Sequence, residues 1–467
     1  MNRASAVCRS HQQHFSMPIS SLPSTPRHTR VARQAAGLLS MALLSMPGLT
    51  AAQAIPGTPA RPDQGTPRQG GGGGFGFSID LGSLVKAVQA LTSEERYSSP
   101  DTAALPAYEP RQLIISWLSA SAPQQAQAAT AVQVAGGTLL ANAVLPNLGL
   151  NIAVLSFVTD AEAEQALTRI RTAAPGITAD RQAVAYPMQQ AAAPTPAKQY
   201  AHELLKVAAS GKGKLPAGIT VGIIDTEVTN ADSLALAGFK AKRIFADTDK
   251  AAPADHGNAV AAIVAGTGQG FEGLAQGVSL RAAGVMREVA PGINATNTLL
   301  VAQALDWMVG EKAQVVNLSL GSASDTVLAA VVGRSLSAGL VLVSAAGNGG
   351  PAAAPSYPAA YPGVIAVTAV DAQKRLYARA NRGSYVAIAA PGVDVWVPLT
   401  ANDSKGKYMS GTSFASPFVT AAVAQALAVQ TAATAKTTPQ THLQNLCSKA
   451  ANIGPTGPEV GCGLLQM

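Results

Sequence analysis

Two kinds of apolar segment alternate through the largest part of the sequence, from about residue 199 to residue 467. Short runs of almost continuous aliphatic or β-branched residues are separated by stretches with helical composition. The runs are 219–224, 315–320, 340–344 and 364–370, and two of the helical stretches are 297–309 and 325–337. Continuous runs of this kind suit parallel strands that are buried on both faces. The pattern therefore predicts an α/β fold with an open, doubly wound and mostly parallel sheet.

Four reactive or polar residues stand where such a sheet binds its ligands, beyond the carboxyl ends of strands or at helix starts. Asp225 ends the first run, and Asn348 follows the run 340–344. His256 lies at a strand-to-helix transition, and Ser413 opens the apolar run 418–429, which predicts a buried helix. Each residue alone has an ordinary structural explanation, such as a helix cap, a packed histidine or an Asn-Gly turn.

Together these four residues supply the roles that acyl transfer requires. Ser413 would be the nucleophile in the first turn of its helix, where unpaired N–H groups favour a developing oxyanion. We expect Pro417 within about the same turn, where its missing N–H matters little. His256 would be the general base and then the acid, Asp225 would orient the imidazole, and Asn348 would complete the oxyanion hole with the Ser413 N–H.

The segment 411–417, Gly-Thr-Ser-Phe-Ala-Ser-Pro, matches the motif G-T-S-x-A-x-P of the subtilisin-like serine peptidases, the subtilases, at every specified position. The order of the four residues above is also that family's order. Residues 215–467 therefore resemble a subtilase, and the resemblance implies a serine endopeptidase with a Ser/His/Asp triad. It also implies that two segments wall the primary specificity pocket, Ser319, Leu320 and Gly321 on one side and Ala345, Ala346 and Gly347 on the other. The sequence does not identify the floor of that pocket.

The chain departs from the family's pattern beside two of the four residues. Glu227 stands where the Asp motif usually has Gly, and Asn258 and Ala259 replace Thr and the second His of the motif H-G-T-H-V-A-G. These changes motivate an alternative, a catalytically inactive subtilase fold that serves as a binding or scaffold protein. A sedolisin fits less well because His256 and Asn348 are present, and an α/β-hydrolase esterase would need G-x-S-x-G.

The N-terminus has the pattern of a secretory signal. Residues 1–54 contain five arginines and no Asp or Glu, then an apolar run at 35–49, then Ala52-Gln53-Ala54. We expect cleavage after Ala54 and a secreted protein, extracellular or periplasmic. A membrane anchor is the alternative, but Pro47 and Gly48 interrupt the run before it reaches the roughly 20 residues of a span. Because five of the formal +7 charges lie in this leader, the basic balance does not predict nucleic-acid binding.

A smaller module precedes the large domain. After a Gly- and Pro-rich linker at 55–108, residues 109–187 predict strand, helix, strand, strand, helix and strand, the split βαβ order of a ferredoxin-like α+β fold. By element order and position the module resembles the subtilase propeptide, which acts as chaperone and inhibitor. An Ala- and Pro-rich linker at 188–198 would hold the site of self-cleavage, with Tyr186 or Met188 just before the cut, and the peptidase domain would occupy 199–467.

Cysteine usage and carboxylate content complete the expectations. Cys8 leaves with the leader, and Cys447 and Cys462 form an even pair in a chain sent to an oxidising compartment. We expect a disulfide between them, with two separate buried thiols as the alternative. The loop 266–273 holds one carboxylate, Glu272, so we predict no metal there, although a weak calcium site elsewhere stays open. The expected partners are polypeptide substrates and the chain's own propeptide, and we expect a monomer without cofactor or stable membrane association.

Overall fold

The computed structural model describes residues 105–188, 190–191, 199–207, 215–232, 234–268, 271–398, 406–429, 438–455 and 457–467. The expected leader, almost all of the first linker and most of the second linker lie outside these residues. The described residues all belong to one compact unit.

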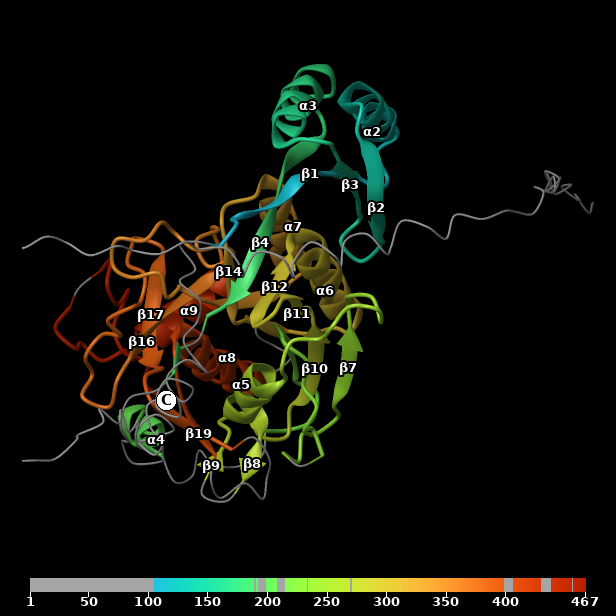
Figure 1. Ribbon diagram of the computed structural model, residues 1–467. Helices are drawn as coiled ribbons and strands as arrows, with labels where there is room; N and C mark the ends of the chain where they lie inside the picture. The colour runs from blue at the N-terminus through green and yellow to red at the C-terminus, as the bar shows by residue number, and fades with distance from the viewer. Residues whose placement is uncertain are drawn as a thin grey trace, which may run out of the picture. The chain divides into compact units, whose positions relative to one another are not determined.

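The first part of this unit is a small α+β module (Figure 1). Its elements are β1 (Tyr108–Leu118), α2 (Ala122–Ala135), β2 (Thr138–Leu145), β3 (Leu150–Ser156), α3 (Asp160–Ala173) and β4 (Thr178–Pro187). Side chains of Ser121 and Thr159 cap the two helices by accepting from the N–H groups of Gln124 and Glu162. The element order confirms the predicted split βαβ arrangement.

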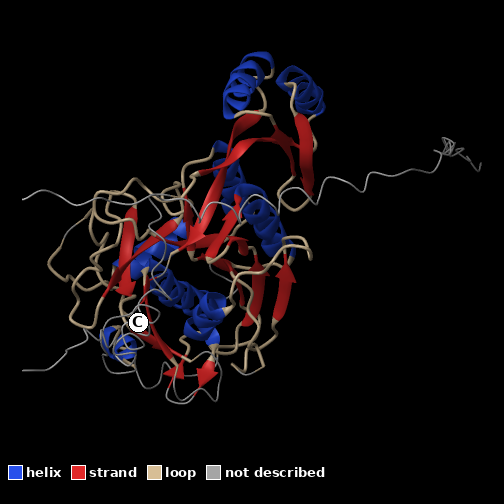
Figure 2. Ribbon diagram, viewed as in Figure 1, coloured by secondary structure: helices blue, strands red, loops and turns tan. Residues whose placement is uncertain are grey.

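The module's strands pair antiparallel in the order β4-β1-β3-β2, and the two faces of this sheet bury different partners. On one face, α2 and α3 cover Leu113, Ile115 and Leu155 (Figure 2). On the other face, Ile114 and Ile152 join a core that also contains residues of the large domain. The period-2 alternation of β1 thus divides its side chains between the module's own core and its docking face.

The large domain is built on a parallel sheet of seven strands in the order β17-β16-β15-β13-β6-β10-β7. The strands are β6 (Thr220–Asp225), β7 (Lys240–Arg243), β10 (Ser279–Gly284), β13 (Val315–Leu318), β15 (Val341–Ala345), β16 (Ile365–Val370) and β17 (Val386–Pro391). Every neighbouring pair in this order is parallel. The predicted doubly wound α/β fold is confirmed, although the sequence patterns did not single out β7, β10 and β17.

Helices cover both faces of this sheet. They are α4 (Tyr200–Leu204), α5 (Asp255–Ala265), α6 (Thr298–Gly310), α7 (Thr326–Ser337), α8 (Thr412–Val429) and α9 (Pro439–Cys447). Helices α5 and α8 share a core with Val315, while α6 and α7 share the opposite core with Val316. Adjacent residues of β13 thus serve opposite faces, as a strand buried on both sides requires. Helix α8 is long and apolar enough to cross a membrane, but 72% of it is buried within the fold.

The remaining strands are short and lie outside the parallel sheet. They are β5 (Gln190–Ala191), β8 (Thr267–Gly268), β9 (Phe271–Glu272), β11 (Arg287–Ala290), β12 (Ile293–Asn297), β14 (Leu320–Ser322), β18 (Val395–Val397) and β19 (Lys407–Ser410). The run 315–320, expected as one strand, breaks at Ser319 into β13 and β14, because β14 leaves the parallel sheet and pairs antiparallel with β4. The last strand of the small module therefore ends inside the large domain (Figure 1).

A disulfide joins Cys447, at the end of α9, to Cys462 in the C-terminal segment. That segment runs beside the sheet, where the N–H of Cys462 donates to the carbonyl of Ala387 on β17. The cross-link therefore ties α9 to the outermost strand of the parallel sheet.

Replacing both cysteines by serine should lower the free energy of unfolding by about 3 kcal/mol, because the disulfide closes a loop of 15 residues in the unfolded chain. Chemical denaturation of the wild type and the double variant measures this. Dithiothreitol should destabilise the wild type by a similar amount and leave the double variant unchanged. Equal stability of the two proteins under oxidising conditions would contradict the prediction.

Candidate active site

Asp225 and His256 form a buried pair at the carboxyl edge of the parallel sheet. Asp225 is the last residue of β6, His256 is the second residue of α5, and their side chains are 1% and 2% exposed. Asp225 Oδ1 lies 2.6 Å from His256 Nδ1 and also accepts the N–H of Thr226 at 2.6 Å. A carboxylate buried this deeply needs such donors. The contact occupies Nδ1 and leaves Nε2 as the ring nitrogen that can react.

The start of α5 reaches this pair because Gly257 has no side chain. A Cβ on Gly257 would lie 2.5 Å from the carbonyl oxygen of Thr226, far inside contact distance. The Gly257 N–H instead donates to Thr226 Oγ1 at 2.8 Å. The glycine thus lets the helix approach the end of β6 closely enough for the His256–Asp225 hydrogen bond.

Ser413 lies in the first turn of α8, as its sequence context predicts, and is completely buried. Its hydroxyl donates to the main-chain carbonyl of Met188 and lies 3.2 Å from the carbonyl oxygen of Ser319. The His256 ring packs against Phe414, the residue after the serine, with ring centroids 5.1 Å apart. Nε2 of His256 is buried and finds no hydrogen-bond partner among the described residues. The serine hydroxyl is therefore directed at a carbonyl group of the chain itself.

Pro417 lies inside α8, beyond the first turn in which it was expected. Proline has no N–H to donate to the carbonyl four residues earlier, which here belongs to Ser413. Ser319 Oγ replaces that donor at 2.9 Å and itself accepts from the side-chain amide of Asn317 at 2.8 Å. Because of the proline, the carbonyl of Ser413 is available to accept from Ser319, at the break between β13 and β14.

The side-chain oxygen of Asn348 is held by the first residue of α8. Its Oδ1 accepts both the N–H of Thr412, at 3.0 Å, and the hydroxyl of Thr412, at 2.9 Å. Because the oxygen is fully used, Nδ2 is the end left to donate, and it is buried without a partner in the described part of the chain. A buried, unpaired N–H close to Ser413 has the property required of an oxyanion donor. No local sequence pattern indicates this role of Thr412.

The end of the small module occupies the cleft in front of Ser413. Strand β4 pairs antiparallel with β14, with Tyr186 opposite Gly321, and on its other side with β12. After Met188, whose carbonyl receives the Ser413 hydroxyl, β5 pairs with β19, which directly precedes α8. The chain thus crosses the site as an extended segment that is paired on both sides of the Met188 carbonyl.

The residues that depart from the family motifs make specific contacts. Asn258 Oδ1 accepts the N–H groups of Thr229, at 2.9 Å, and Asn230, at 3.2 Å, which holds the loop that follows Asp225. Glu227 forms two hydrogen bonds with the guanidinium of Arg243, at 2.9 and 3.0 Å. Ala259 lies on α5 and is completely buried in the core. These side chains therefore support the segment behind Asp225 and do not reach toward Ser413.

Within the described residues, no group of three or more His, Cys, Asp or Glu side chains is placed to hold a metal ion. The weak calcium site that the sequence left open therefore stays untested.

The sequence profile described as the Subtilase family matches residues 216–463. The chain belongs to this family. Subtilisin DY of Bacillus licheniformis is 33% identical over 259 residues, which are 53% of this chain and 89% of that protein. The thermostable alkaline protease of Halalkalibacterium halodurans is 34% identical over 214 residues, 45% of this chain and 57% of its own length. This subtilase thus spans little more than half of some curated relatives.

The crystal structure of fervidolysin from Fervidobacterium pennivorans has the same fold. It superposes with a TM-score of 0.62 at 21% sequence identity and covers 77% of this chain and 60% of that one. The match therefore supports the architecture described above, including the mostly parallel sheet of the subtilase domain.

Replacing Asn258 by alanine should destabilise the fold by about 1–3 kcal/mol, because two backbone N–H groups lose a common acceptor. Thermal unfolding compared with the wild type measures the effect. Asn294→Ala is the matched control, since the Oδ1 of Asn294 accepts no hydrogen bond from the described residues. An Asn258 variant as stable as the Asn294 variant would show that the loop does not depend on this side chain.

Proposed function

We propose that this subtilase is a secreted serine endopeptidase that is made as a self-processing zymogen. The observation that carries the proposal is the hydrogen bond from the Ser413 hydroxyl to the Met188 carbonyl, within a segment paired on both sides like a bound peptide. Its substrates are polypeptides that enter the same cleft as extended strands. The first of them is the chain itself.

The proposed reaction follows from the positions of the four polar residues. Ser413 Oγ attacks the carbonyl carbon of the substrate while His256 Nε2 takes the hydroxyl proton, and Asp225 stabilises the imidazolium through Nδ1. The oxyanion accepts from Asn348 Nδ2 and from the Ser413 N–H. Collapse of the tetrahedral intermediate breaks the C–N bond, His256 gives its proton to the leaving amine, and water then hydrolyses the acyl-enzyme by the same route.

One hydrogen bond supports a particular site for the maturation cut. Because the Ser413 hydroxyl donates to the carbonyl of Met188, the proposed cut falls between Met188 and Gln189, at one of the two positions that the sequence suggested. Pro187 lies opposite Leu320 and Tyr186 opposite Gly321, which places these residues along the non-leaving side of the site. The residues 190–191, paired with β19, lie on the leaving side.

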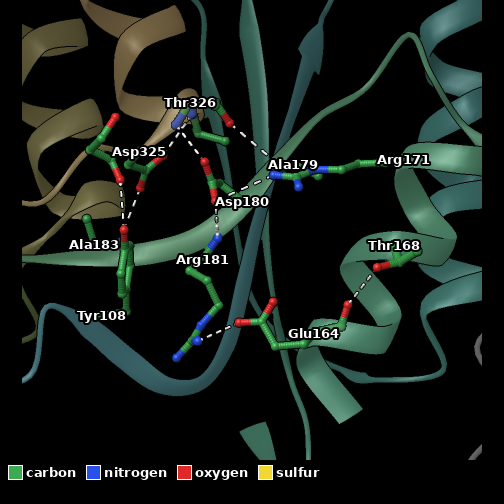
Figure 3. Close-up of polar contacts among 12 residues, drawn as sticks. Tyr108, Glu164, Thr168, Arg171, Ala179, Asp180, Arg181, Ala183, Asp325 and Thr326 are labelled. Carbon is green, nitrogen blue, oxygen red and sulfur yellow. Dashed lines mark hydrogen bonds and ion pairs between the residues drawn. The ribbon is translucent and has the colours of Figure 1, made fainter. Parts of the chain in front are cut away.

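The small module would remain as an inhibitor because carboxylates fasten it to the starts and sides of α6 and α7. Asp306 on α6 accepts the N–H groups of Asn147, at 2.8 Å, and Leu148, at 3.0 Å. At the start of α7, the module's Asp180 accepts the N–H of Thr326 at 3.0 Å, while Asp325 accepts the N–H of Ala183 at 3.2 Å (Figure 3). Burial raises the pKa of the Asp325 carboxyl, which further N–H and hydroxyl donors hold in place.

The alternative, an inactive fold used for binding, is motivated by the free Nε2 of His256 and by the changed motif flanks. The contacts of Glu227 and Asn258 weaken it, because they brace the loop behind Asp225 without displacing the four chemical residues. The hypothesis of an active peptidase therefore accounts for more of the site than the hypothesis of an inactive scaffold does.

Ser413→Ala should abolish self-cleavage, whereas the wild type, expressed from Ile55, should be cut after Met188. Intact mass and N-terminal sequencing measure both, and the new N-terminus should be Gln189. Asn348→Ala should slow the cut by about 10²- to 10³-fold, the usual loss for one oxyanion donor. A wild type that stays uncut and takes up no fluorophosphonate would favour the inactive scaffold.

Binding of the cleaved module should weaken as the pH rises from 10 to 12. Burial and the charge of Glu109 raise the pKa of Tyr186 from 10.0 to about 12 in the docked state. The contribution of this phenol to binding is therefore complete below pH 10 and is lost as the pH rises toward 12. Titration calorimetry of 105–188 against 189–467 carrying Ser413→Ala measures this, with Tyr186→Phe as control. A Phe variant with the same pH dependence as the wild type would contradict the assignment.

A further inference from the structure

The outer strand of the small module's sheet presents apolar side chains to solvent. Strand β2 is the last in the order β4-β1-β3-β2, and no described strand pairs with its outer edge (Figure 1). Leu139 is 52% exposed, Leu140 54% and Val144 69%. Soluble proteins usually keep such edge strands short or charged, so three large apolar side chains together indicate an interaction surface.

The strand register places two of these side chains on the face of the sheet that carries the module's helices. Leu139 lies opposite Leu155 and Val144 lies opposite Asn151, and residues directly opposite each other share a face. Leu155 belongs to the core that α2 and α3 cover. The two helices thus cover the inner part of this face and leave Leu139 and Val144 exposed on its β2 side.

A hollow of about 610 Å³ lies between α2 and this exposed strip. Trp117 of β1 and Asn151 of β3 line it from the sheet, and Asn151 is paired with Val144, so the hollow continues into the strip. Its remaining lining residues follow one side of α2 at helical spacing and carry no charge: Gln125, Ala128, Ala129 and Val132. We call this hollow, together with Leu139 and Val144, the α2–β2 groove.

A segment that precedes the module in the sequence has a complementary pattern. Its apolar residues recur at the spacing i, i+3, i+4, i+7 and i+10, which predicts one apolar face of a helix. They are Leu81, Leu84, Val85, Val88 and Leu91. The one charged residue of 81–91, Lys86, falls on the opposite face. A helix over 81–91 would be about 15 Å long, and the strip from Leu139 to Val144 is about 17 Å long.

The connection between this segment and the module is long enough for docking. Sixteen residues, 92–107, separate the segment from the start of β1 at Tyr108. Trp117 lies about 30 Å further along β1, whereas sixteen extended residues reach about 55 Å. A tether of this kind gives the segment a millimolar effective concentration at the groove. A second copy of the chain would instead have to lose its translational and rotational freedom to bind there.

We propose that residues 81–91 dock in the α2–β2 groove as an amphipathic helix and form a third helix of the small module. The apolar face of the segment covers Trp117, Leu139 and Val144, and Lys86 faces solvent. The module therefore begins near residue 81, within the region that the sequence predicted to be a linker. This inference goes beyond the proposed function, because it concerns the folding of the module and holds whether or not Ser413 cuts the chain.

Hydrogen exchange measured on residues 55–467 carrying Ser413→Ala, which prevents the proposed self-cleavage, tests the inference. The backbone amides of 85–91 should exchange at least about tenfold more slowly than those of an unstructured chain, because a docked helix must open before it exchanges. The amides of β1 and β3 in the same samples report whether the module itself remains folded.

Variants on the groove and on the segment assign this protection to their contact. Adding Leu139→Lys and Val144→Lys together should remove it, whereas the matched pair Val289→Lys and Val429→Lys, at exposed valines of the large domain, should keep it. On the segment, Val85→Asp should remove the protection.

Lys86→Asp is the matched control for Val85→Asp, because it places the same side chain on the neighbouring residue but on the opposite face of the helix. It should leave the amides of 85–91 protected.

Three results would overturn the inference. The first is exchange of 85–91 at the rates of an unstructured chain, and the second is protection that persists when both groove lysines are present. The third is a dimer by light scattering that the groove lysines convert to a monomer while 85–91 stays unprotected, which would assign the groove to a second copy. Fluorophosphonate uptake by the wild type tests the proposed function separately and does not depend on the groove.

Discussion

The burial of a carboxylate at the end of a parallel strand is the constraint around which this site is arranged. Asp225 is almost inaccessible to water, so it needs donors, and the fold supplies the His256 imidazole and the Thr226 N–H. For the imidazole to reach it, α5 must start against the end of β6, which requires Gly257. The loop between them must also hold its position, which Asn258 and the Glu227–Arg243 pair support. The Asp225–His256 pair and the contacts around it therefore together offset the cost of burying the Asp225 carboxylate.

The sequence predicted what depends on local pattern. Runs of β-branched residues indicated the central strands, and the position of Asp225, Asn348 and Ser413 after strands or at a helix start followed from the edge where parallel strands end. The split βαβ order of the small module was also evident, because its helices begin with side-chain caps and its strands alternate. The strands β7 and β10 were harder to predict, since β7 is charged with all four residues exposed to solvent and β10 contains an arginine.

What the sequence could not provide are contacts between distant segments. Thr412 can orient Asn348 because two segments that are distant in the sequence meet in the fold. Ser356 lies beside Gly321 for the same reason, because a further pair of distant segments meets there. The break of the run 315–320 at Ser319 has the same origin. An aliphatic run carries no signal that its last residues will leave one sheet to pair with β4, because that pairing depends on a module more than a hundred residues earlier in the chain.

The two sides of the Met188 carbonyl are held with unequal strength, and this asymmetry bears on how a zymogen of this kind could regulate itself. The preceding segment is paired by β12 and β14 and continues into a folded module fastened to α6 and α7. The following segment is paired by β19 over the two residues of β5.

Once the bond after Met188 is cut, the segment that follows it loses its covalent link to the small module. The segment that precedes the cut keeps every contact that positioned it. Water would then release the acyl group, but the new carboxyl terminus would stay in the cleft at high effective concentration, because the module that carries it remains docked. In the proposed zymogen, cutting and inhibition would therefore be separate events, and activity would appear when the module leaves or is degraded.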